Sequence, residues 1–162
     1  MTFPDHATYL EFWKQHPAFA GGQGGDVAEG LAGYASYDLT GTEPELRSSA
    51  SLEAVRADSM DLYGGGAVLA ALTGLGAGRS QEGRTVSLMT APRGLLNQTP
   101  GLYSPSEVER WTAELPAVTF RQVPDVNHYT IVMGRTGASA VASEVLRLRE
   151  RSQPTLTRRQ RL

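Results

Sequence analysis

Two β-type runs with a helix-like segment between them constrain the fold of this chain most. Residues 84–91 (RTVSLMTA) and 117–123 (AVTFRQV) have the composition of buried strands, and a proline follows each run. Between them, residues 104–115 begin with Ser-Pro, which places proline at the first position of a predicted helix. An alanine-rich segment at 137–149 predicts a final helix. This β-α-β-α order favours an α/β fold with parallel strands joined by crossover helices.

The first half of the chain predicts helices rather than strands. Asp5 and Ser51 are suited to cap the first turns of two of them. Two parallel strands make a poor complete domain, because parallel sheets are normally covered on both faces. We therefore expect the chain to be part of a larger fold. The predicted segments are helices over about 6–15, 26–37 and 52–63, a loop over 38–48, a short fourth helix or apolar turn over 67–75, and a linker over 76–83.

Composition narrows the classes of function. A formal net charge of −2 over 162 residues gives no electrostatic reason to expect a nucleic-acid partner. There is no cysteine, and none of the three histidines has metal-ligand spacing, so we expect neither disulfides nor a metal site. The longest apolar stretch, 64–75, is too short and too rich in glycine to span a membrane. The N-terminus carries no apolar signal region, so the expected location is the cytoplasm.

One loop carries the residue with the clearest chemical potential. The second β-type run breaks at Pro124, and His128 follows before the last predicted helix. A doubly wound sheet presents a general base in this way, on a loop at the carboxyl edge of its strands. The alternative is an ordinary loop histidine that forms a hydrogen bond with a backbone carbonyl.

Several segments resemble proteins of the α/β-hydrolase fold. The sharpest are TAPRGLLNQTPGLYS (90–104) and VPDVNHYTIVMG (123–134), with HPAF and YDL…ELRSS…EAVRADS before them. The resemblance implies a partial α/β-hydrolase fold, with a helical lid followed by the C-terminal part of the core. Residues 1–80 would form the lid, residues 81–150 the core segment and residues 151–162 a frayed tail.

The resemblance also assigns the candidate site residues. In that fold the triad runs in the order nucleophile, acid, histidine, so His128 would be the general base and Asn97 would occupy the acid position. Asparagine can hold an imidazole by a hydrogen bond, but it cannot stabilise imidazolium as an anion does. Asp125 is a weaker substitute for the acid, and both it and Asn97 are also ordinary turn residues. Three lid aromatics would line the substrate pocket or form the lid's own packing: Phe12, Trp13 and Phe19.

The nucleophile motif of that fold, G-x-S-x-G, does not occur in this sequence. We therefore expect an N-terminally shortened hydrolase, whose serine would precede Met1 and would attack an ester or similar small-molecule acyl substrate. The resemblance implies no cofactor, and the chain alone should be inactive. A second hypothesis is a non-catalytic remnant or interaction module. A half-sheet exposes an unpaired edge, which would recruit a partner or drive self-association.

Overall fold

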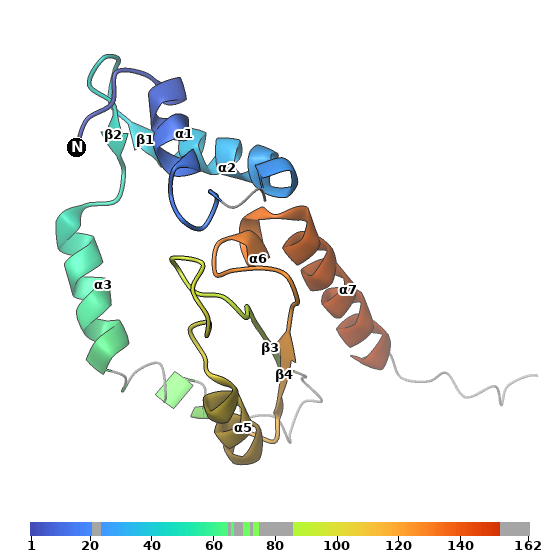
Figure 1. Ribbon diagram of the computed structural model, residues 1–162. Coiled ribbons are helices and arrows are strands. Elements are labelled where there is room, and N and C mark those ends of the chain that lie inside the picture. The colour runs from blue at the N-terminus through green and yellow to red at the C-terminus, as the bar shows by residue number, and fades with distance from the viewer. Residues whose placement is uncertain (21–23, 65, 67–69, 72, 75–85, 153–162) are drawn as a thin grey trace, which may run out of the picture.

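The computed structural model describes residues 1–20, 24–64, 66, 70–71, 73–74 and 86–152. It is a mixed α/β structure (Figure 1). The predicted linker over 76–83, much of the apolar segment over 67–75 and most of the tail over 151–162 lie outside the described residues. The helices are α1 (His6–Lys14), α2 (Gly24–Asp38), α3 (Leu52–Gly64), α5 (Pro105–Glu114), α6 (Thr130–Met133) and α7 (Arg135–Ser152). The strands are β1 (Leu39–Thr40), β2 (Arg47–Ser48), β3 (Val86–Thr90) and β4 (Val118–Gln122).

Strands β3 and β4 form the parallel pair that the sequence predicts. Val86 lies opposite Val118, and the register continues to Thr90 opposite Gln122. Helix α5 connects the two strands and packs against β4. It begins with a capping box, in which the Ser104 hydroxyl accepts from the Glu107 amide while the Glu107 carboxylate accepts from the Ser104 amide. The predicted β-α-β unit is therefore confirmed.

The helix starts in the first half also follow local chemistry. The Asp5 carboxylate accepts from the Thr8 amide at 2.7 Å, and the Ser51 hydroxyl accepts from the Ala54 amide at 3.0 Å. These bonds satisfy amides that have no partner within the helix. Helix α1 ends at Lys14, before the His-Pro pair that the sequence predicts as its stop.

The predicted loop over 38–48 contains a short antiparallel hairpin, with Leu39 opposite Ser48. A buried carboxylate holds it. Asp38 accepts hydrogen bonds from the hydroxyls of Tyr9, Ser48 and Ser49, the two serine bonds measuring 3.1 and 3.2 Å. Two-residue strands are too short to show an alternating pattern, so the sequence gives no sign of this hairpin.

The hydrophobic core lies mainly in the helical half of the chain. Trp13 is the centre of its aromatic contacts, with ring centroids 5.3 Å from Tyr34, 6.2 Å from Phe19 and 6.1 Å from Tyr129. Because Tyr129 follows β4, this cluster joins the helical half to the sheet half. Two clusters of buried residues form the core of the helical half: Phe3, Tyr9, Ala35 and Leu46 in one, and Ala18, Phe19, Val27 and Leu31 in the other. In the described part of the second half, the buried apolar residues are Leu115, Ala117, Val118, Val123 and Val126.

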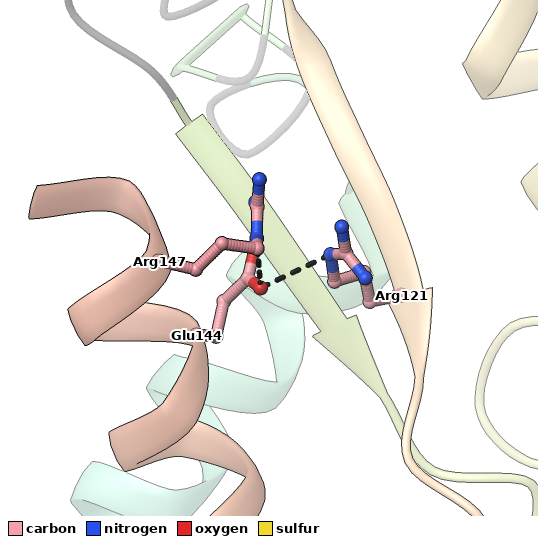
Figure 2. Close-up of polar contacts among 3 residues, drawn as sticks. All are labelled: Arg121, Glu144 and Arg147. Carbon is pink, nitrogen blue, oxygen red and sulfur yellow. Dashed lines mark hydrogen bonds and ion pairs between the residues drawn. The ribbon is translucent and has the colours of Figure 1, made fainter. Parts of the chain in front are cut away.

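Helix α7 is tied to the sheet by an ion cluster (Figure 2). The Glu144 side chain is only 7% exposed, and Arg147 Nε donates to its Oε2 at 2.7 Å. Arg121 on β4 reaches the same oxygen at 3.1 Å. The bond from Arg147, helped by the charge of Arg121, lowers the pKa of Glu144 to about 2. The cluster therefore stabilises the fold above about pH 4.5, the usual pKa of a glutamate, and that contribution is lost as the pH falls towards 2.

The sheet is covered less than parallel sheets usually are. Most side chains of β3 and β4 are half-buried, whereas parallel strands are normally enclosed on both faces. In the described part of the chain β3 pairs with β4 alone. No helix among the described residues is both long and apolar enough to cross a membrane. Apolar side chains also lie exposed on α6 and α7, at Val132, Val141, Val145 and Leu146.

The Tyr9–Asp38 bond gives a test of how the hairpin is held. Tyr9→Phe should lower the free energy of unfolding by about 1–2 kcal/mol, because the buried Asp38 loses a donor. Burial, with the bond to Asp38, raises the pKa of Tyr9 to about 12. A raised folded-state pKa means that stability is kept below pH 10 and lost as the pH rises towards 12, and Tyr9→Phe should remove this loss.

Urea unfolding at pH 7 and across pH 9–12 measures both effects. The matched control is Tyr37→Phe, because Tyr37 is 87% exposed and its loss should leave stability unchanged. Equal stability of the two variants would contradict the role assigned to Tyr9.

Candidate functional site

The loops that follow β3 and β4 lie side by side at the carboxyl ends of the two strands. The Val123 amide donates to the Thr90 carbonyl at 2.9 Å as the strands end. Further along, Arg93 and Asn127 form a parallel bridge. The Arg93 guanidinium also donates to the Asp125 carbonyl at 2.8 Å. The structure thus brings together the two loops that the sequence singles out.

Asn127 is the residue that organises this edge of the sheet. Its side chain is fully buried, and its amide nitrogen donates to the Ala18 carbonyl at 2.8 Å and to Asn97 Oδ1 at 3.1 Å. Its Oδ1 accepts from the amides of Tyr129 and Thr130 at 3.0 and 2.9 Å. These four bonds use both donors and both lone pairs of the side chain. One residue therefore joins the helical half, the loop after β3 and the start of α6.

Asn127 is not among the site residues predicted from the sequence, but a local pattern marks it. The Thr130 hydroxyl accepts from the Asn127 amide at 2.7 Å, while Asn127 Oδ1 accepts from the Thr130 amide. Each side chain thus bonds the other's backbone, as the two members of a capping box do at the same spacing. Asn-x-x-Thr before a predicted helix could have identified Asn127.

Asn97 and Asp125 both occupy turns with left-handed backbone, at φ of 63° and 60°. Asparagine and aspartate adopt this conformation more readily than other residues with a side chain. Asn97 is half-buried and bonds Asn127, whereas Asp125 is exposed. In the described part of the chain no hydrogen bond links either side chain to His128. The geometry thus gives both residues the turn role that the sequence leaves open.

His128 is exposed, and its ring meets Tyr129 edge-on with centroids 5.6 Å apart. It lines an open pocket of about 300 Å³ above the carboxyl edge of β3. The imidazole can therefore reach a molecule bound over this edge. No serine hydroxyl among the described residues forms a hydrogen bond with it. Other residues of the pocket wall include Thr90, Ala91, Arg93, Tyr103 and Ile131.

The three aromatic residues predicted to line a substrate pocket have different environments. Phe19 is 5% exposed and belongs to the buried core. Phe12 is 45% exposed, and together with the half-buried Trp13 it lines a second pocket of about 430 Å³. This pocket has no lining residue in common with the His128 pocket. The described residues contain no group of three or more acidic or histidine side chains that could hold a metal ion.

Comparisons with protein-family models, with curated proteins and with solved structures find no match to this chain. What the site does must therefore be inferred from its own geometry. Two elements of that geometry bear on chemistry: the exposed imidazole of His128 and the buried amide network beside it.

Two substitutions of Asn97 should differ in their effect on the free energy of unfolding. Asn97→Ala should lower the free energy of unfolding by about 2 kcal/mol, since it removes the bond to Asn127 and forces alanine into a left-handed turn. Asn97→Asp keeps an acceptor for Asn127 and a side chain that tolerates this turn, so it should stay within about 0.5 kcal/mol of the wild type.

Urea unfolding of the two variants at pH 7 measures the difference. If they are equally stable, the Asn97–Asn127 bond and the turn at Asn97 do not contribute about 2 kcal/mol to the free energy of unfolding.

Proposed function

We propose that this chain is the histidine-bearing part of an α/β-hydrolase-like enzyme that cleaves an ester or a similar acyl substrate. The observation that carries the proposal is the position of His128. It lies exposed on the loop after the second of two parallel strands, next to the loop that holds Asn97. In the α/β-hydrolase fold the chain order is nucleophile, acid, histidine. Asn97 precedes His128 in the order expected of the acid and the histidine.

In this proposal His128 is the general base. It takes the proton of a serine hydroxyl as the oxygen attacks the acyl carbon, and it returns that proton to the leaving group. The described residues contain no serine in position for this step. A serine on a further strand beside β3 would meet the requirement, because no described residue pairs with the other side of β3.

Asn97 acts indirectly in this scheme. Its carbonyl oxygen bonds the side chain of Asn127, the residue that precedes His128. Asn97 is therefore a positioning residue, which fixes the backbone from which the imidazole extends. A neutral amide cannot replace the carboxylate that stabilises imidazolium in a complete triad. This is a second reason to expect no hydrolysis by the chain alone.

A second candidate function is an interaction module without catalysis. The half-buried strands and the exposed Val141, Val145 and Leu146 of α7 favour it, because clustered apolar surface of this kind marks an interaction site. The partner would extend the parallel sheet at β3. The two candidates share this requirement and differ in whether His128 takes part in chemistry.

The test is to capture the tagged chain from cells that produce it and to treat the captured material with a fluorophosphonate probe. We expect a serine in the captured material to be labelled, and labelling to fall at least 100-fold with His128→Ala, because the serine loses its base. The purified chain alone should show no labelling and no hydrolysis of p-nitrophenyl butyrate.

His6→Ala is the matched control, because His6 is an exposed histidine paired with Glu43 at 3.6 Å and should not affect labelling. Labelling that is equal in the two variants, or ester hydrolysis by the purified chain that survives His128→Ala, would remove His128 from the mechanism. Capture without any labelling would favour the interaction module.

A further inference from the structure

The second pocket, between α1, β2 and the start of α3, has the build of a ligand site. Its volume of about 430 Å³ lies in the range typical of small-molecule sites. It shares no wall residue with the His128 pocket, so it is a separate feature of the molecule. Ligand binding at this pocket would not depend on the function proposed for His128.

The pocket wall is aromatic and held in place by its own contacts. The Phe3 ring lies 4.6 Å from that of Tyr9 and 5.4 Å from that of Phe12, between centroids. Tyr9 and Phe12 are stacked, with an interplanar angle of 12°. Phe3 and Tyr9 are buried, but Phe12 remains 45% exposed. This wall offers apolar surface that needs little ordering before a ligand binds.

Some polar groups around the wall already have partners within the protein, and one has no carboxylate partner among the described residues. The hydroxyls of Tyr9 and Ser48 both donate to the buried Asp38. Arg47, which also lines the pocket, is exposed, and in the described part of the chain no carboxylate pairs with it. Its backbone is fixed by pairing with Thr40 in the hairpin. Arg47 is therefore a cationic side chain that is available to recognise a charged ligand.

We propose that this pocket binds an amphiphilic carboxylate. The apolar chain or ring of the ligand lies against Phe3, Phe12 and Trp13, and its carboxylate accepts two parallel hydrogen bonds from the Arg47 guanidinium. A neutral apolar molecule would leave Arg47 without a partner. An anion without an apolar part would bury no surface against the aromatic wall.

Decanoate is the probe, and Trp13 is the reporter. The chain contains two tryptophans, so Trp111→Phe leaves the fluorescence of Trp13 alone. We expect decanoate, below its micelle concentration, to cause a saturable change in this fluorescence. Calorimetric titration of the wild type should give the same Kd for decanoate as the fluorescence of Trp111→Phe. Agreement would show that the substitution does not disturb the pocket.

Two rim variants test the recognition chemistry. Arg47→Gln should weaken decanoate binding by about fivefold, the effect of losing one exposed ion pair. Leu52→Glu should weaken it similarly, because it adds a like charge at the rim. Leu52 is 65% exposed and is the first residue of α3, where an acidic residue favours the helix. Decanol should bind the wild type and Arg47→Gln with equal affinity.

The matched control is Arg149→Gln, which removes an exposed arginine on α7 and should leave decanoate binding unchanged. His128→Ala should also leave it unchanged, so that failure of the hydrolase proposal is separate from failure of this one. The absence of saturable decanoate binding would overturn the proposal. So would equal Kd values for Arg47→Gln and Arg149→Gln.

Discussion

The four hydrogen bonds of the buried Asn127 side chain are the contacts on which the rest of the structure depends. They reach Ala18 in the helical half, Asn97 after β3 and the first amides of α6. An unpaired polar group in a fully buried position costs more than the bond itself contributes. All of these segments must therefore be in place together, and Asn127 links the parallel sheet to the helices around Trp13.

A supporting residue and the candidate catalytic residue are neighbours in the chain. Asn127 is fully buried, while the next residue, His128, is exposed beside an open pocket. A reactive imidazole must reach its substrate, yet it must also be held in a defined position. The buried amide network meets the second need without covering the ring. The same network uses Asn97 as scaffold, which explains why the residue in the expected acid position bonds Asn127 instead of His128.

The sequence predicted the features that depend on local chemistry. The predicted caps at Asp5 and Ser51 involve residues three positions apart, Pro105 begins α5 as predicted, and the β-α-β order follows from strand and helix signals in one segment. It did not predict contacts made over long separations. The hairpin depends on Asp38, whose partner Tyr9 is 29 residues away, and Asn127 bonds Ala18 across 109 residues. No local pattern reports contacts over such separations, so the sequence leaves the turn role of Asn97 and the burial of Phe19 open.

In the part of the chain that the structure describes, β3 pairs on one side only, and we propose that this open edge receives a further strand. Hydrogen exchange of the β3 amides, Val86–Thr90, in a dilute monomeric sample tests it most directly. Because alternate amides of a parallel strand point towards opposite neighbours, we expect protection from exchange to alternate along β3. Protection of all five β3 amides in that sample would show that the edge is already covered, and would contradict the claim.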